Sequence, residues 1–267
     1  MKHLMRDIAP VSEEGWQAVE AEAVQALRHF LVARRLVDVH GPDGWEQEIA
    51  RRGSVDDVAD APIGIRARVR SVQPLVEYRA EFWLDRVELD AVDRGARDAD
   101  LQPASDAARR LALAEDDAVF NGSKTALIAG IAEATPHGRL PIRDDYVQYP
   151  STVARAIDVL QAAGIGGPYA VALGPRCYTG VVETTEMGGY PVLEHLRLIT
   201  GGSVLWAPSI DGALVMSQRG GDYLITLGQD TSMGYLDHDA ERVHLYLEES
   251  FTFQVLRPEA AVHLAYA

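Results

Sequence analysis

The chain has 267 residues, of which 47% are apolar and 24% are charged, and its formal net charge at pH 7 is −15. This composition is ordinary for a globular protein, and a chain of this length is able to bury a substantial core. The excess of carboxylates argues against a nucleic-acid partner, because phosphate binding requires clustered Lys and Arg. The single Cys177 excludes an intramolecular disulfide and a cysteine-based metal site, and we expect it to be a small buried side chain.

The start of the chain does not have the pattern of a signal peptide. Residues 1–9 carry charges at Lys2, Arg6 and Asp7 where a signal peptide has an apolar run. No stretch approaches the roughly 20 consecutive apolar residues of a membrane span. We therefore expect a cytoplasmic protein without a membrane partner.

A long helix is predicted after a short amphipathic opening segment, residues 1–10, which ends at Pro10. Ser12 is suited to be the N-cap of this helix, and Glu13 and Glu14 suit the positive end of the helix dipole. The apolar positions of the helix recur at steps of three and four, which predicts one buried face. These positions are Trp16, Val19, Ala23, Leu27 and Phe30.

Strict alternation predicts two strands between residues 63 and 82. In the first, over residues 63–69, apolar positions alternate with Arg66, Arg68 and Arg70, and after Pro74 the second covers residues 76–82. An arginine row of this kind is able to bind a phosphate, but a solvated or subunit-bridging face is the commoner reason for it. The apolar positions are Ile63, Ile65, Ala67, Val69, Val76, Tyr78, Ala80 and Phe82.

Two helices, a buried strand and a loop are predicted in the middle of the chain. One helix begins at Ser105 and ends near Gly122, and another covers residues 151–163. Residues 169–173 are typical of a short buried strand, and residues 183–191 of a loop, because of their Gly and Pro content. The expected inward positions of the two helices are Leu111, Ala114, Ala118, Val153, Ala156, Ile157 and Leu160.

Near the end of the chain, two strands are predicted around a glycine-punctuated segment. Their apolar positions recur with the period of two that a half-buried strand requires. These positions are Tyr223, Ile225 and Leu227 in the first strand, and Phe251, Phe253 and Val255 in the second. Helices and strands are thus mixed along the chain without a linker or an internal repeat, which indicates an α+β fold.

No catalytic or cofactor-binding motif is found. Residues 164–168 are not a dinucleotide fingerprint, because Pro168 prevents the helix that should begin there. Residues 115–117 and 237–239 are the best candidate metal ligands, but consecutive residues point in different directions, so a solvated or salt-bridged role is favoured. No serine lies in a nucleophile elbow, although a triad assembled in three dimensions stays open. We assign no catalytic and no metal-binding residue.

Several short motifs together resemble one family along the whole chain. They are residues 1–10, 34–39, 115–122, 167–169, 188–191, 219–235 and 249–255. In this order they are similar to the encapsulin shell proteins, the family once called linocin-type bacteriocins. Those proteins build hollow icosahedral compartments with the fold of a tailed-phage capsid protein, the HK97-like fold.

The resemblance implies an α+β fold with a peripheral domain, an extended arm (the E-loop) and an axial domain. The N-terminal helix and the start of the peripheral domain would occupy residues 1–45, and the arm residues 46–82. The helix region of the peripheral domain would follow in residues 83–135, and the axial domain in residues 136–224. Residues 225–267 would return to the peripheral domain as strands.

The function that the resemblance implies is that of a shell component without catalytic activity. About sixty copies would close into an icosahedral shell around a cargo enzyme that carries a C-terminal targeting peptide. The cargo would be a dye-decolourising peroxidase or a ferritin-like protein, which fits iron storage or protection from oxidative stress, and pores would admit small solutes. Two alternatives are kept: an enzyme of the protease or bacteriocin type, and a true phage major capsid protein. The acidic composition disfavours the second alternative, because a packaged genome favours a basic interior.

The resemblance also implies contact surfaces between subunits and a pore. The arm residues Ile63, Ile65 and Val69 would contact a neighbouring subunit. A loop would line the pore on the five-fold axis, where Glu183 and Glu186 would create a negative potential that favours cations. The expected loop residues are Glu183, Thr184, Thr185, Glu186, Met187, Gly188, Gly189 and Tyr190.

A wall beside the N-terminal helix would bind the targeting peptide of the cargo. Its apolar members would bury Leu or Ile side chains of the peptide, each worth about 1.5–3 kcal/mol. Asp38 and Asp230 would pair with basic residues of the peptide and Arg34 would orient Asp38, unless Arg34 and Asp38 form only an intrahelical ion pair. Some relatives hold a flavin against a tryptophan just after the arm. This sequence has Val87 at that position, and Trp83 lies at a different place, so no cofactor is expected. The expected wall residues are Leu4, Ile8, Ala33, Arg34, Val37, Asp38, Val39, Asp230 and Thr231.

Overall fold

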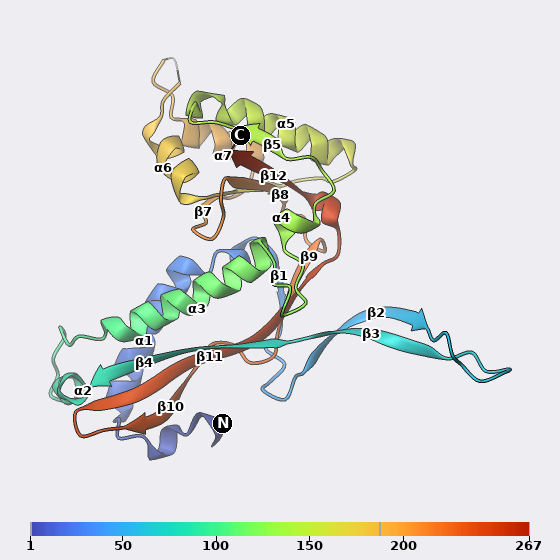
Figure 1. Cartoon of the computed structure of the whole chain (residues 1–267). Helices are drawn as coiled ribbons and strands as arrows, with labels where there is room; N and C mark the ends of the chain where they lie inside the picture. The colour runs from blue at the N-terminus through green and yellow to red at the C-terminus, as the bar shows by residue number, and fades with distance from the viewer. Residues whose placement is uncertain (1, 187, 267) are drawn as a thin grey trace.

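The longest strand, β11 (Arg242–Val255), organises the molecule, because three other strands pair with it (Figure 1). The computed structural model describes residues 2–186 and 188–266. The first part of β11 lies between two antiparallel neighbours, and its last residues pair with a third strand that also carries a short parallel edge strand. The two antiparallel neighbours are β4 (Val76–Asp85) and β10 (Ser232–His238), the third strand is β9 (Tyr223–Leu227), and the edge strand is β1 (Asp38–His40).

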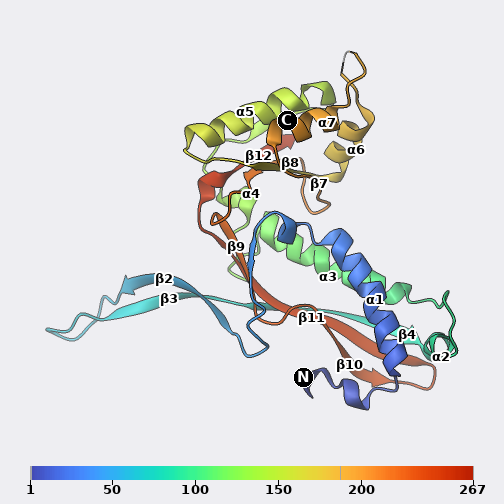
Figure 2. The same cartoon turned by 180° about the vertical axis from the view of Figure 1, so that it is seen from behind.

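Helices α1 (Glu13–Phe30) and α3 (Gln102–Phe120) pack against each other and against one face of this sheet (Figures 1 and 2). The predicted N-cap of α1 is confirmed, since the Ser12 side chain accepts a hydrogen bond from the backbone N–H of Gly15 at 2.8 Å. The predicted inward face is confirmed for its first three positions, while the last two are only partly buried. The buried side chains of α1 include Trp16, Val19, Ala23 and Ala26.

Helix α3 begins at Gln102, so the prediction of a start at Ser105 is wrong by one turn. Pro103 lies in the first turn, where its missing N–H leaves no hydrogen bond unmade. Ala118 is buried as predicted, but Ala114 is exposed, because the helix turns Glu115 to the core in its place.

A second sheet lies at the other end of the molecule, with helices packed around it (Figures 1 and 2). The predicted strand over residues 169–173 is confirmed as β6, and the predicted helix over residues 151–163 as α5, with its four inward positions buried. The strand order is β5-β12-β8-β6-β7. In chain order these elements are β5 (Leu140–Ile142), α5 (Tyr149–Ala162), β6 (Tyr169–Leu173), α6 (Pro175–Glu183), α7 (Val192–Thr200), β7 (Val204–Trp206), β8 (Ala213–Ser217) and β12 (Ala261–Tyr266).

A two-stranded hairpin of β2 (Ile49–Asp57) and β3 (Arg68–Pro74) projects away from both sheets (Figures 1 and 2). The strand predicted over residues 63–69 is wrong, because β3 begins only at Arg68 and the preceding residues form the tip of the hairpin. Alternation usually reports two different environments, but Ile63 is 106% exposed and both faces of this segment meet solvent in the single subunit.

The strand predicted over residues 76–82 is confirmed as part of β4, although it lies outside the hairpin. Ala80 and Phe82 are buried under the helices, and Val76 and Tyr78 are partly buried. The partners of β4 lie on β11, from Asp85 opposite Arg242 to Val76 opposite Phe251. The projecting hairpin therefore consists of β2 and β3 alone, and the chain after Pro74 returns to the main sheet.

The two apolar rows predicted near the end of the chain are confirmed, and they lie opposite each other in antiparallel register. Phe251 pairs with Leu227, and Phe253 pairs with Ile225. The shorter elements complete the fold. They are the 3-10 helices η1 (Lys2–Leu4), η2 (Arg6–Ile8), η3 (Ala33–Arg35), η4 (Tyr146–Gln148) and η5 (Pro258–Ala260), and the helices α2 (Arg86–Asp93) and α4 (Ile131–Ala134).

Candidate functional site

Arg34 joins three carboxylates that are far apart in the sequence. Its Nε donates to Glu115 Oε1 at 2.8 Å, its Nη1 to Asp230 Oδ1 at 2.6 Å, and its Nη2 to Glu249 Oε2 at 3.0 Å. The side chains of Glu115 and Glu249 are 0% exposed, whereas that of Asp230 is 50% exposed. These four residues, named here the Arg34 cluster, therefore begin in the core and reach the surface at Asp230.

Asp116 is buried beside this cluster and holds the backbone of η3 in place. Its two carboxylate oxygens accept hydrogen bonds from the N–H groups of Val32 at 3.0 Å and Ala33 at 2.9 Å. Burial raises the pKa of Asp116 to about 7, although the two N–H bonds act in the opposite direction. The salt-bridged role considered for residues 115–117 is thus confirmed for Glu115, while Asp116 binds backbone donors.

Glu249 is held from a second side by Thr231, whose Oγ1 donates to Glu249 Oε2 at 2.9 Å. Burial and the nearby charge of Glu115 raise the pKa of Glu249 well above its ordinary value, and Arg34 opposes this shift. Burial lowers the pKa of the Arg34 guanidinium, but its bonds to Glu115 and the surrounding carboxylates outweigh this effect and raise the pKa. The structure therefore brings three of the predicted wall residues together: Arg34, Asp230 and Thr231.

The sequence carried a signal that both Glu115, considered above only as a candidate metal ligand, and Glu249, not considered as a site residue, are buried. Glu249 occupies an inward position of the alternation in β11, between the buried Leu247 and Phe251. Glu115 lies four residues after the buried Leu111, on the inward face of α3. A charged residue on an apolar face requires a partner, but nothing in the spacing identified Arg34 as that partner.

The opening segment lies against β10, and it presents only some of its apolar side chains. Leu4 is 6% exposed and Ile8 is 63% exposed. His3 Nε2 lies 2.9 Å from Gln229 Oε1, and the His3 ring stacks on Trp45 with centroids 4.5 Å apart. Leu4 is therefore packed inside the subunit, whereas Ile8 is exposed to solvent, so the apolar side chains of this segment do not form one buried face.

Asp38 is separate from Arg34, so both predicted roles for this pair are wrong. Asp38 Oδ2 accepts a hydrogen bond from the backbone N–H of Gly221 at 2.6 Å. Within residues 2–186 and 188–266, no ion pair joins Asp38 to Arg34. The physical reason is that Arg34 lies in η3 and Asp38 begins the strand β1, so the two side chains do not share a helix face.

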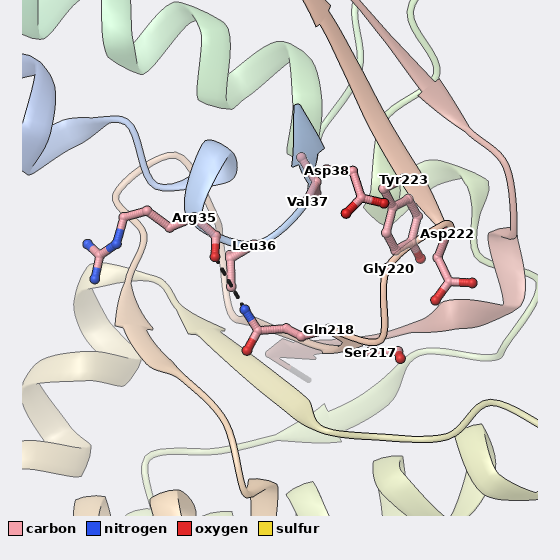
Figure 3. A pocket seen from close by; sticks show the side chains of 9 residues that line it. All are labelled: Arg35, Leu36, Val37, Asp38, Ser217, Gln218, Gly220, Asp222 and Tyr223. Atoms are coloured by element: carbon pink, nitrogen blue, oxygen red, sulfur yellow. Dashed lines mark hydrogen bonds between the residues drawn. The ribbon is translucent and has the colours of Figure 1, made fainter. Parts of the chain in front are cut away.

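A cavity of about 190 Å³ opens beside Asp38, where the connection between η3 and β1 meets the turn between β8 and β9 (Figure 3). Val37 and Asp38 line it together with residues outside the predicted wall, among them Ser217, Gln218 and Tyr223. Val39 lies in the exposed edge strand β1 and is 42% exposed. Ala33 is fully buried, so its side chain presents no surface to a partner.

The predicted pore loop connects α6 to α7 as a tight turn (Figure 1). Glu186 N–H donates to the carbonyl of Tyr190 at 2.8 Å, and Val192 N–H donates to that of Thr184 at 3.1 Å. Glu186 Oε1 lies 2.7 Å from His195 Nδ1, whereas Glu183 is exposed. The remaining predicted loop residues Thr185, Gly188 and Gly189 are exposed, and Met187 lies outside the described residues.

Comparisons with known proteins agree with one another over nearly the whole chain. A family model described as an encapsulating protein for peroxidase matches residues 1–252. The type 1 encapsulin shell protein of Rhodospirillum rubrum is 47% identical over 99% of this chain and 96% of its own length. The corresponding shell protein of Mycobacterium tuberculosis is 40% identical over 100% of both chains.

Solved structures show the same fold at lower identity. The virus-like particle from Pyrococcus furiosus has a TM-score of 0.66 at 18% identity, covering 92% of this chain and 97% of its own. The capsid of a Myoviridae phage has a TM-score of 0.53 at 10% identity, covering 89% of this chain and 92% of its own. The predicted HK97-like α+β fold is thereby confirmed, and the chain belongs to the family of type 1 encapsulin shell proteins.

Proposed function

We propose that about sixty copies of this shell protein close into an icosahedral compartment that encloses a cargo enzyme, and that the shell protein itself does not catalyse a reaction. The family description, an encapsulating protein for peroxidase, makes a peroxidase the first cargo to test. A ferritin-like protein is the second, by resemblance. The protease and phage-capsid alternatives are not favoured, because full-length relatives at 40% identity or more are encapsulin shell proteins.

The projecting hairpin is the observation that carries the proposal. Val55, Ile65 and Val69 on it are 45%, 61% and 58% exposed. An isolated two-stranded ribbon is marginally stable in water, and its two open edges are able to pair with further strands. A neighbouring subunit would cover these side chains and edges, so the hairpin is suited to assembly more than to the stability of its own subunit.

Charged substitutions on the hairpin test this role. Ile65→Asp with Val69→Asp should yield folded small oligomers, because each replaced side chain would bring a carboxylate into the contact between subunits. Size-exclusion chromatography and negative-stain microscopy measure the result. Ser54→Asp with Ala59→Asp is the matched control, since it adds the same charges to the hairpin without removing a large apolar side chain. Intact shells from the first variant would overturn the assembly role.

The proposed cargo site combines exposed apolar side chains with the surface end of the Arg34 cluster. Ile8 and Val39 are exposed, and Asp230 remains half exposed while it binds Arg34. A short apolar peptide with a basic residue fits these groups, because apolar burial supplies affinity and the carboxylate selects the charge. The buried members of the cluster would keep Asp230 in one orientation.

Solute entry is assigned to the loop between α6 and α7, around a five-fold axis. Exposed carboxylates repeated around such an axis create a negative potential that favours cations. A cytoplasmic location without nucleic-acid or membrane partners is part of the same proposal. In the part of the chain that the structure describes, no helix combines the length and apolar character needed to cross a bilayer.

A further inference from the structure

Three oxidisable side chains meet at the end of the molecule that holds the second sheet. Tyr149 is the first residue of α5, Cys177 lies in the first turn of α6, and Tyr266 is the last residue of β12. These three elements lie together around the second sheet in Figure 1, although they are far apart along the chain. The three residues are named here the Cys177 cluster.

The sulfur of Cys177 lies between two phenol groups. Cys177 Sγ is 3.2 Å from the hydroxyl oxygen of Tyr149 and 3.1 Å from that of Tyr266, and the two hydroxyl oxygens are 3.3 Å apart. A thiol and two hydroxyls each carry one hydrogen to donate and each can accept one, so the three groups satisfy one another. The hydrogen of each group therefore lies against the sulfur or oxygen of a neighbour.

Only one member of the cluster reaches the surface. Cys177 is 0% exposed and Tyr149 is 1% exposed, whereas Tyr266 is partly exposed. The guanidinium of the exposed Arg176 covers the Tyr266 ring, with its carbon 4.0 Å from the ring centroid. A positive charge at this distance opposes a cationic ring, so loss of an electron from Tyr266 favours loss of its phenolic proton as well.

The members of the cluster keep their hydrogens at neutral pH. Burial raises the pKa of the Cys177 thiol and the pKa values of the Tyr149 and Tyr266 hydroxyls. A buried thiol without thiolate character is a poor nucleophile, and its burial keeps peroxide and other thiols away from it. Disulfide formation and direct attack on peroxide are therefore disfavoured at Cys177, whereas donation of the S–H hydrogen atom to a contacting group is not.

We propose that Cys177 is a hydrogen-atom donor that removes radicals from the shell, with Tyr266 as their point of entry. A one-electron oxidant of the organic phenoxyl class takes an electron from Tyr266 and becomes a phenolate, while the phenolic proton of Tyr266 passes to water. The Tyr266 phenoxyl radical then takes the hydrogen atom of the Cys177 S–H group across 3.1 Å. This second step restores the phenol and leaves a thiyl radical.

The burial of Cys177 gives this transfer its consequence. Phenoxyl radicals on exposed tyrosines of two chains couple to dityrosine, which joins the chains covalently. A radical on a side chain that is 0% exposed cannot contact a second chain. The cluster would thus protect the wall from cross-linking by phenoxyl radicals that an enclosed peroxidase releases. This source of the oxidant rests on the proposed function, whereas the transfer from Cys177 to Tyr266 does not.

Pulse radiolysis of empty shells of the full chain tests the transfer. Azide radicals generated by the pulse oxidise tyrosine by one electron, and the absorbance of the phenoxyl radical then reports its decay. A fraction of this absorbance should decay in a fast first-order phase, because the donor and the acceptor are in contact. Cys177→Ser retains a hydrogen-bonding group, but an alcohol O–H bond is too strong to give its hydrogen atom to a phenoxyl radical, so the fast phase should be lost.

Tyr266→Phe removes the hydroxyl that would accept the hydrogen atom, and it should lower the amplitude of the fast phase several-fold. Because Tyr266 is partly exposed, this variant tests the proposal even where serine at position 177 disturbs the core. Tyr78→Phe is the matched control, since Tyr78 is a partly exposed tyrosine on β4 in the main sheet, and it should retain the fast phase.

A fast phase of equal amplitude in the wild type and Cys177→Ser would overturn the donor, and an unchanged fast phase in Tyr266→Phe would overturn the entry point. Dityrosine fluorescence after exposure of empty shells to a free peroxidase, hydrogen peroxide and a simple phenol measures the consequence. It should rise several-fold in Cys177→Ser, and an unchanged yield would overturn the protective role. Because these shells hold no cargo, none of these failures would bear on the proposed function.

Discussion

Arg34 carries a single positive charge among more carboxylates than it can neutralise. Glu115 and Glu249 are both buried against it, and Asp230 takes a further hydrogen bond. One guanidinium cannot neutralise two buried carboxylates, and an unpaired buried charge is costly in free energy. Protonation of one buried acid is therefore favoured. The raised pKa values of Asp116 and Glu249 have this origin.

A pH dependence of stability follows from Asp116. Its pKa rises from 3.8 to about 7 on folding, so the folded state binds a proton more tightly than the unfolded state between these values. The stabilisation is fully present below the unfolded pKa and is lost as the pH rises through the folded pKa, with about 1.4 kcal/mol for each pKa unit. Glu249 acts in the same direction.

Asp116→Asn isolates this contribution. The amide cannot titrate, and it can accept only one of the two backbone hydrogen bonds. The variant should therefore be less stable than the wild type by a margin that is larger at pH 5 than at pH 8. Denaturant-induced unfolding at both values measures the margin. A margin independent of pH would show that Asp116 is ionised in the folded protein throughout this range.

At the scale of elements, two acidic residues at the connection between α6 and α7 lie in different environments: Glu183 is the last residue of α6, and Glu186 lies in the loop that follows. Glu186 lies 2.7 Å from His195, whereas Glu183 is exposed and not paired in the described structure. Glu183→Gln should therefore lower the initial rate of cation entry into loaded shells at low ionic strength more than Glu186→Gln does. Iron uptake by an enclosed ferritin-like reporter provides the measurement. Equal rates for both variants and the wild type would remove the loop as the gate.

Elements whose apolar faces meet a core of the same subunit were predictable from the sequence. The alternation in β4, β9 and β11 and the helical period in α1 and α5 each identified the inward face, although the end positions Leu27, Phe30 and Val255 are only partly buried. The strand predicted over residues 63–69 failed because its alternation does not correspond to a buried and an exposed face within the subunit, where Ile63, Ile65 and Val69 are all exposed. The Arg34 cluster was not predictable as a set, because its three carboxylates lie 81 to 215 positions from Arg34 and only the fold brings them together.

At the scale of the whole molecule, the cargo site proposed above is assembled from both ends of the chain. Ile8 comes from the opening segment, Asp38 from β1 and Asp230 from the turn before β10. Ile8→Asp with Asp38→Ala should give shells that assemble normally but no longer co-purify with a tail-fused reporter. Val87→Asp with Asp158→Ala makes matched changes at exposed positions elsewhere and should load normally. Undiminished loading in the first variant would exclude this wall.

Because the long strand β11 belongs to both cores of the subunit, we expect the subunit to unfold as a single unit. Its first half contributes Val243 and Leu245 to the core under α1 and α3, and its second half contributes Phe251 and Phe253 to the core that includes the second sheet. Neither core can lose this strand without exposing the other, so the two are expected to unfold in one cooperative transition. Native-state hydrogen exchange should give the same opening free energy for amides in both halves of β11. A shell wall built from such subunits is therefore expected to have no half that unfolds separately and lets the contents of the shell escape.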